Sequence, residues 1–167
     1  LVMAASAYNL LGLYSVIVDM DYYKSLSYFQ QGLEIAEQAP GGPYSSLAHN
    51  LSLTYYLRKD PSGLKYAVDL YERGKSGNNR FMIFSGSYVS AAMYYLLGDY
   101  ERALELISEA ASLVDELHDH TGVYALYGDI LQAMGRYREA KAYYNRALDH
   151  EDVAQSTSAM NAYLGYG

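Results

Sequence analysis

Residues 124–148 read YALYGDILQAMGRYREAKAYYNRAL, and the second half of this stretch decides the fold. In it, large and small side chains alternate at spacings of three, four and three residues, at Tyr137, Ala140, Tyr144 and Ala147. An α-helix makes one turn in about 3.6 residues, so this spacing keeps all four side chains on one face of a helix. The small side chains on that face let a neighbouring helix approach closely.

The same pattern occurs three more times upstream. Its copies begin at Tyr22, Leu64, Tyr100 and Tyr137, which gives offsets of 42, 36 and 37 residues. Its small positions are occupied by Ser25, Gly32, Ala67, Gly74, Ala103, Ala110, Ala140 and Ala147. A period of roughly 20–50 residues is typical of a repeat array, not of one compact enzyme core. The sequence therefore predicts an all-α fold, an α–α superhelix or solenoid built from stacked helical hairpins.

Each copy of the pattern follows another amphipathic stretch, so the helices come in pairs. The predicted pairs are 3–19 with 21–38, 44–59 with 61–75, 80–97 with 99–117, and 121–134 with 136–149. The corresponding repeats span about 3–38, 44–75, 80–117 and 121–149, and a fifth, incomplete repeat spans 155–167. We expect residues 1–167 to form one repeat domain of about four and a half hairpins, cut from a larger protein.

Breaker residues separate the predicted helices. Asp60-Pro61 reads as an N-cap followed by proline at the first helical position, where the missing N–H is tolerated. Gly98 and Gly135 stand at tight helix–helix turns, where the backbone φ angle can be positive, and Asp99 is a ready cap for the following helix. Residues 39–43 (APGGP) form the longest loop and account for the first, longer offset.

Composition excludes several classes of function. The net charge of −7 argues against a duplex-binding surface, which needs a basic stripe. The absence of cysteine excludes disulfides and thiol chemistry. The sequence contains no run of 18 or more apolar residues, so it predicts no membrane span. The compartment stays open, with the cytoplasm favoured over the periplasm. Tyrosine supplies 21 of the 24 aromatic side chains, and its ring suits both helix packing and peptide binding.

The fourth copy resembles the tetratricopeptide repeat. The resemblance is carried by Tyr124, Tyr127-Gly128, Leu131, Gly135-Arg136-Tyr137, Ala140, Tyr144 and Ala147-Leu148. The other copies keep parts of the same pattern, and Leu164-Gly165 restarts it 37 residues after Tyr127-Gly128. The copies are longer than the usual 34 residues, and in this they look like repeats from the sensing regions of large bacterial regulators.

The resemblance implies where a ligand would bind, because the first helix of each pair lines the concave face in this family. The matching positions are Asn9, Leu13, Ser52, Tyr56, Tyr88, Ala92, Tyr95, Asp129 and Gln132. They would form a groove of tyrosines, with a few amides and one acid, that holds an extended or helical peptide. An equally weighted alternative is that Tyr88 and Tyr95 only pack against their neighbours. The Lys and Asn that bind acidic chaperone tails in some members are absent here.

We therefore expect a non-enzymatic module that binds a protein or peptide, in a larger bacterial signalling or transcription-regulating protein. The alternative is a sensor region that takes a sugar or peptide as a small ligand. No catalytic residues and no cofactor are predicted, and this region is not expected to bind nucleic acid directly. The His118-x-His120 segment could hold a metal ion, but a solvated polar turn is the favoured interpretation. An exposed apolar end makes a homodimer possible.

Overall fold

The computed structural model describes residues 1–39, 41–117 and 121–149, with the backbone alone for 115–117, 121 and 149. Within these residues the chain forms eight α-helices and one short 3-10 helix, and no strand. The helices are α1 (Val2–Ile17), α2 (Tyr22–Glu37), α3 (Tyr44–Leu57), α4 (Leu64–Ser76), α5 (Arg80–Leu97), α6 (Tyr100–Leu117), α7 (Thr121–Ala133) and α8 (Tyr137–Asp149). The all-α prediction is confirmed, and the predicted incomplete repeat at 155–167 lies outside the described residues.

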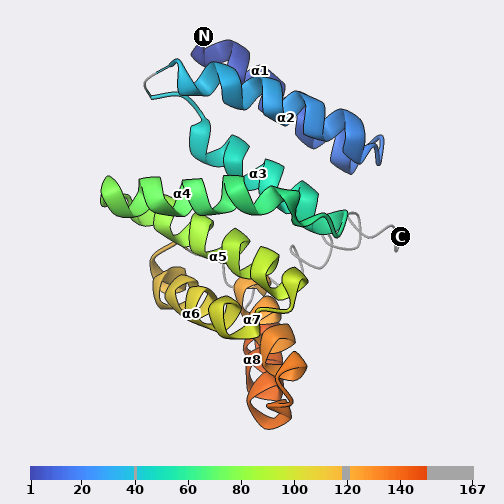
Figure 1. Cartoon of the computed structure of the whole chain (residues 1–167), viewed down its shortest axis with the longest axis vertical. Helices are drawn as coiled ribbons and strands as arrows, with labels where there is room; N and C mark the ends of the chain where they lie inside the picture. The colour runs from blue at the N-terminus through green and yellow to red at the C-terminus, as the bar shows by residue number, and fades with distance from the viewer. Residues whose placement is uncertain (40, 118–120, 150–167) are drawn as a thin grey trace.

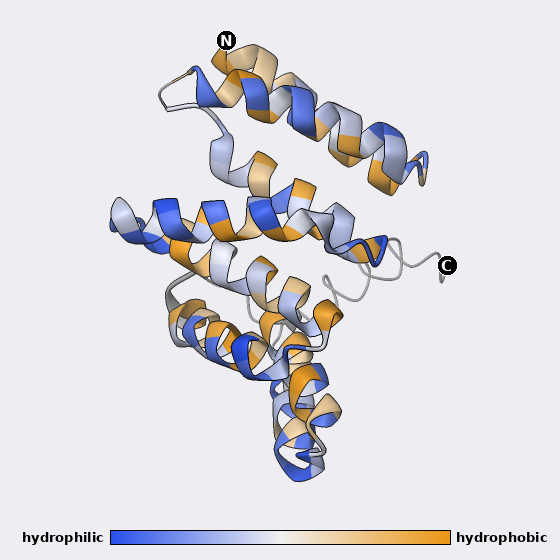
Figure 2. Cartoon of the chain, in the orientation of Figure 1, coloured by the Kyte–Doolittle hydropathy of each residue, from blue (hydrophilic) through white to orange (hydrophobic). Residues whose placement is uncertain are grey.

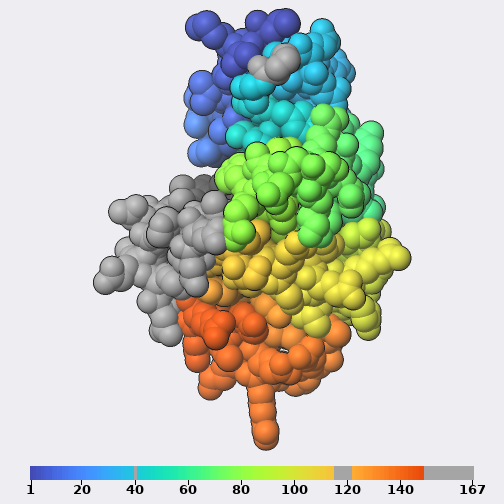
Figure 3. All heavy atoms as spheres, turned by 90° about the vertical axis from the view of Figure 1, so that its left-hand side faces the viewer, coloured from blue at the N-terminus to red at the C-terminus, as the bar shows by residue number. Residues whose placement is uncertain are grey.

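Consecutive helices pack into hairpins, and the hairpins stack in sequence order. The hairpins are α1–α2, α3–α4, α5–α6 and α7–α8, and each also contacts the next through the pairs α2–α3, α4–α5 and α6–α7. In Figure 1 the pairs follow one another down the longest axis, from α1 at the top to α8 at the bottom. Figure 3 shows the same order on the surface, where the colours run from blue to orange along that axis. This is the side-by-side arrangement of a helical-hairpin solenoid.

The small positions of the repeated pattern lie inside the stack, as predicted. Ser25, Ala67, Ala103 and Ala110 are fully buried, and Ala140 and Ala147 are at most 7% exposed. Gly32 and Gly74 are buried as well. The 3-4-3 spacing therefore marks the face of each second helix that meets its neighbours.

Two glycines show how closely the helices of one hairpin approach each other. A Cβ atom added to Gly12 in α1 would lie 2.3 Å from the ring of Phe29 in α2. A Cβ atom added to Gly128 in α7 would lie 2.4 Å from the ring of Tyr144 in α8. The first and the fourth hairpin therefore use the same contact, a large ring of the second helix seated on a glycine of the first.

The closest contact between hairpins joins α4 to α5. A Cβ atom added to Gly86 would lie 2.5 Å from the backbone N and Cα of Tyr71, and one added to Gly74 would lie 2.6 Å from the backbone N of Ile83. Tyr71 and Gly74 stand three residues apart in α4, as Ile83 and Gly86 do in α5. The two glycines therefore serve one helix crossing, which we call the α4–α5 crossing.

Five turns between helices share one design. In each of them a residue with positive φ follows one helix, and the next residue begins the following helix; these residues are Met20, Lys59, Asn78, Gly98 and Gly135. The loop between α2 and α3 differs, because its positive-φ residue, Gly41, lies two residues before the N-cap Pro43. In four of these turns the side chain of the next residue caps the following helix, by accepting a backbone N–H; these caps are Asp21, Asp60, Asn79 and Asp99. The cap at Asp60 opens a 3-10 helix, Pro61–Gly63, before α4 starts, so the predicted helix 61–75 begins as a 3-10 turn.

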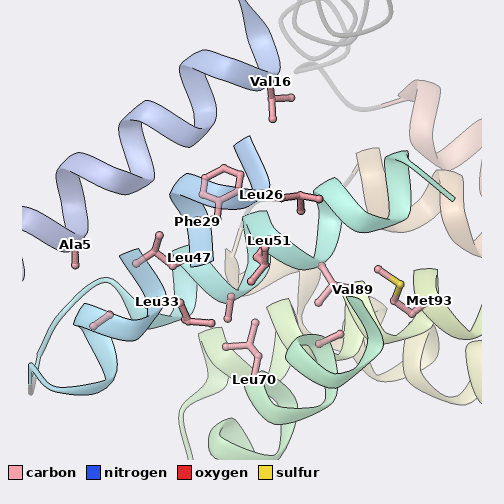
Figure 4. Close-up of a cluster of buried hydrophobic side chains, with 13 residues drawn as sticks. Ala5, Val16, Leu26, Phe29, Leu33, Leu47, Leu51, Leu70, Val89 and Met93 are labelled. Atoms are coloured by element: carbon pink, nitrogen blue, oxygen red, sulfur yellow. The ribbon is translucent and has the colours of Figure 1, made fainter. Parts of the chain in front are cut away.

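The buried apolar side chains form two clusters. The N-terminal cluster includes Phe29, Leu47, Leu51 and Leu70, and Figure 4 shows these side chains on the neighbouring helices α2, α3 and α4. The C-terminal cluster is built on α5 to α8 and includes Ile107, Val114, Val123 and Ile130. Tyr56 and Tyr88 pack against both clusters. The two parts of the core therefore meet at tyrosines of α3 and α5.

Hydropathy differs between the two ends of the stack. In Figure 2 most of α1 is coloured as hydrophobic, whereas α8 carries long hydrophilic stretches. None of the described helices combines the length and the apolar character needed to cross a bilayer. The outer side of α1 exposes Met3, Leu10 and Tyr14, whose side chains are 87%, 67% and 56% exposed.

Candidate functional site

The nine residues predicted to line the groove come from the first helix of each hairpin, α1, α3, α5 and α7. Two of them do not reach the surface. Ser52 is fully buried, and its hydroxyl donates a hydrogen bond to the Ala48 carbonyl of its own helix, at 2.8 Å. Ala92 is 2% exposed and belongs to the C-terminal cluster. These two side chains lie behind the surface that the other seven offer.

The predicted residues of α1 contact the hairpin packed against them. Asn50 of α3 donates a side-chain hydrogen bond to Asn9 Oδ1, at 2.9 Å. Leu13 packs against the N-terminal cluster. These contacts join the first helices of repeats one and two, and they occupy part of the polar surface predicted for α1.

A pocket lies between α3 and α5. Its volume is about 460 Å³, and it is lined by Tyr56, Leu57, Lys59, Tyr95, Leu96 and Tyr100. The rings of Tyr95 and Tyr100 form a tilted pair, with centroids 6.0 Å apart and planes inclined by 44°. Burial raises the pKa of both Tyr56 and Tyr95, so these phenols stay neutral around physiological pH. The structure thus brings together two of the predicted tyrosines on one half-buried wall.

The two predicted residues of α7, Asp129 and Gln132, both contact the hydroxyl of Tyr144. Tyr144 of α8 donates a hydrogen bond to Asp129 Oδ1 at 2.8 Å, and its oxygen lies 3.0 Å from Gln132 Oε1. Burial, and then this hydrogen bond, raise the pKa of Tyr144 to about 12. After burial, the negative charge of Asp129 is the next cause that raises the pKa of Tyr56 and of Tyr95. Asp129 does not line the pocket, but it stands on α7, which contacts α5, and its charge acts on both tyrosines. We call Tyr56, Tyr95, Asp129 and Tyr144 the tyrosine–aspartate cluster.

Comparison with known families identifies the repeat. The family model of the tetratricopeptide repeat matches residues 87–150, which run from within α5 to the end of α8. Residues 87–150 are tetratricopeptide repeats. The search of curated proteins finds no match to the sequence.

The tetratricopeptide family indicates a protein-interaction module. The hairpins α1–α2 and α3–α4 lie before the matched region, but they stack in line with it, and α1–α2 places a ring on a glycine as α7–α8 does. Hairpins packed side by side throughout the described residues are consistent with a tetratricopeptide array.

Sequence reasoning missed the contact that His49 makes between two repeats. Its Nδ1 lies 2.6 Å from the buried Ser85 hydroxyl, and its ring stacks on Tyr88 with centroids 6.2 Å apart. Burial lowers the pKa of His49 to about 4, so the imidazole is neutral at pH 7. The ring therefore joins α3 to α5 as a neutral hydrogen-bonding partner, and Tyr88 is engaged in tetratricopeptide packing.

Three further residues of the site were not predicted. Tyr100 and Lys59 stand at helix–helix turns, and Tyr144 was interpreted only as a packing residue of the repeated pattern. The sequence did contain a signal for the contact of Tyr144. The hydroxyl of a packed tyrosine needs a hydrogen-bond partner, and Asp129, 15 residues earlier, offers one from the other helix of the hairpin.

The possible metal ligands His118 and His120 lie outside the described residues, as does His150. Among the side chains that the structure describes, no group of three or more His, Asp or Glu residues could hold a metal ion.

Proposed function

We propose that this chain is a non-enzymatic module that binds a peptide segment of a partner protein along α3, α5 and α7. The observation that carries the proposal is the pocket lined by Tyr56 and Tyr95, with the hydrogen-bonded pair Asp129 and Tyr144 on the next hairpin of the stack. Asn9, Leu13, Tyr88 and Gln132 would flank the bound peptide.

The chemistry of the cluster supports this role. Tyrosine offers a large, flat contact area and loses little side-chain entropy on binding, which makes it a common anchor at interfaces. Tyr56 and Tyr95 are half-buried, so their side chains have already lost part of their conformational entropy in the free protein and lose less on binding. The walls are therefore preformed and need little rearrangement to receive a peptide.

Phage display of 12-residue peptides on the purified chain tests the proposal. Enriched peptides should bind with affinities that fall about tenfold in Tyr56→Ala and Tyr95→Ala, because each change removes an aromatic anchor. Tyr137→Ala is the matched control, since this tyrosine is 70% exposed on α8 and lies outside the cluster. Equal binding by all four proteins would refute the groove.

The wider setting forms part of the same proposal. The 36- and 37-residue offsets support a place in a larger bacterial signalling or transcription-regulating protein, in which residues 1–167 form one repeat domain. The apolar outer side of α1 supports a homodimer. Light scattering of the chain, compared with Leu10→Lys, tests this last point: a dimer that persists in the variant would exclude the α1 face.

A second candidate function is the sensing of a small ligand such as a sugar or peptide. It is favoured by a pocket of about 300 Å³ between α4, α5 and α6, whose walls include Tyr71, Tyr94 and Glu105. Ser90 also lines this pocket, and its hydroxyl is buried without a hydrogen-bond partner. A bound ligand would raise the melting temperature by mass action. Screening sugars and dipeptides by thermal shift, with Ser90→Ala as the variant, separates this function from peptide binding along α3, α5 and α7.

A further inference from the structure

Among the residues that the structure describes, the carboxylate of Asp129 has no cationic partner. Tyr144 satisfies one of its oxygens, and no Lys or Arg among the described residues forms an ion pair with it. Several other acids of the fold are paired, among them Asp69 with Arg73, Glu109 with Lys75 and Glu139 with Arg136, at 2.8, 2.8 and 2.7 Å. A partly buried carboxylate without a counter-ion favours a cation supplied from outside.

The tyrosines around Asp129 are also without a cation. Elsewhere in the fold, the faces of several tyrosines are covered by the chain's own basic side chains, as in Arg58 over Tyr23 at 4.0 Å and Arg73 over Tyr44 at 4.3 Å. In the described part of the chain, no Lys or Arg lies over Tyr56 or Tyr95. A ring face attracts a cation through its quadrupole, most strongly where the site is desolvated.

Lys59 limits what the pocket can take. It lines the same pocket from the turn between α3 and the 3-10 helix, and its side chain is exposed. It makes no ion pair with Asp129 among the described contacts. Its charge disfavours a second cation at this end of the pocket, so the site suits one basic side chain and not a basic run.

We propose that the tyrosine–aspartate cluster accepts a single basic side chain of the partner peptide, an arginine in preference to a lysine. This inference rests on the proposed peptide-binding function and adds the chemistry of the partner. Arginine is favoured because its planar guanidinium can stack on Tyr56 or Tyr95 while its N–H groups donate to the free oxygen of Asp129. The acidic net charge of the chain, −7, favours the same partner over a distance.

Two pooled peptide libraries test the inference. Both contain 12-residue peptides with randomised uncharged positions, and the central residue is arginine in one and citrulline in the other. Citrulline keeps the shape of arginine but has no charge. The immobilised chain should retain arginine peptides about tenfold better than citrulline peptides at low salt, and the ratio should fall in 0.5 M NaCl.

Asp129→Asn is the deciding variant, because asparagine still accepts the hydrogen bond of Tyr144 and preserves the fold. It should bring the arginine-to-citrulline ratio close to one. Glu101→Gln, an exposed acid on α6, is the matched control for net charge and should keep the tenfold ratio. Lys59→Met should increase the retention of arginine peptides.

Each outcome is informative. Equal retention of both libraries by the unmodified chain would overturn the inference while leaving peptide binding intact. A ratio that survives in Asp129→Asn would place the cation elsewhere and would overturn it too. If neither library is retained, the proposed function fails together with the inference. Circular dichroism of Asp129→Asn confirms that its helices are intact.

Discussion

The α4–α5 crossing leads to a quantitative prediction for Gly86→Ala. The new Cβ would lie 2.5 Å from the N and Cα atoms of Tyr71, whereas ordinary contacts between carbon atoms lie at about 3.5–4.0 Å. The neighbouring atoms are backbone and cannot rotate away, so α4 and α5 must move apart by about 1 Å. The stack then loses close packing along the contact between its second and third hairpins.

The magnitude follows from two opposing effects. Overpacking costs about 1–3 kcal/mol, and the upper end applies because backbone resists displacement. Alanine is about 1 kcal/mol better than glycine in a helix interior, which offsets part of that cost. We therefore expect a net loss of about 2 kcal/mol in the free energy of unfolding. For a chain of this size the melting temperature should fall by about 4–8 °C.

Urea unfolding followed by circular dichroism measures the effect. Gly74→Ala should cost a similar amount, since its Cβ would lie 2.6 Å from the backbone N of Ile83. The double variant should cost less than the sum, because either change opens the same crossing. Gly77→Ala is the control, as its Cβ would meet only the Arg73 carbonyl, at 3.2 Å. A Gly86→Ala protein as stable as the unmodified one, or strict additivity of the pair, would refute a shared close crossing.

Three further predictions follow from single residues. The folded-state pKa of His49 is lowered from 6.5 to about 4, so the folded state resists the proton that the unfolded state takes up, and stability should be lost as pH falls from about 6.5 toward 4. His49→Gln should flatten this loss in urea titrations at pH 7 and pH 5. Ala140→Leu should overpack a 2% exposed contact and cost about 1–3 kcal/mol; an unchanged melting temperature would contradict that placement. Lys59→Gly should stabilise the fold by about 0.5–1 kcal/mol, because Lys59 has a φ of 54°, and destabilisation would argue against positive φ there.

The repeat architecture was predictable because it follows from the spacing of large and small residues within each helix. The 3-4-3 pattern identified the buried face of each second helix, and breakers such as Gly98 and Gly135 placed the turns, where both residues have positive φ. The positive φ at Met20 and Lys59 was not predictable, since neither residue favours that conformation. Those turns are imposed by the packing of the helices on either side. The 3-10 start at Pro61–Gly63 was also missed, because a proline after an N-cap suits the beginning of either helix type.

The site was predictable only in part. The helix that supplies each residue follows from the family resemblance, and two of the predicted residues, Tyr56 and Tyr95, line one pocket. The burial of Ser52 depends on rotation of its helix by a fraction of a turn, which spacing does not resolve. Contacts such as Tyr144 with Asp129, or His49 with Ser85, depend on how two helices are placed against each other. No local pattern in the sequence records that placement.

Tyr56 and Tyr88 are the residues at which the two apolar clusters meet. Tyr56 also lines the pocket between α3 and α5, so a peptide bound there would contact a residue that both clusters share. Such a ligand would stabilise the packing of the second hairpin on the third, and the two ends of the array would then move less freely relative to each other.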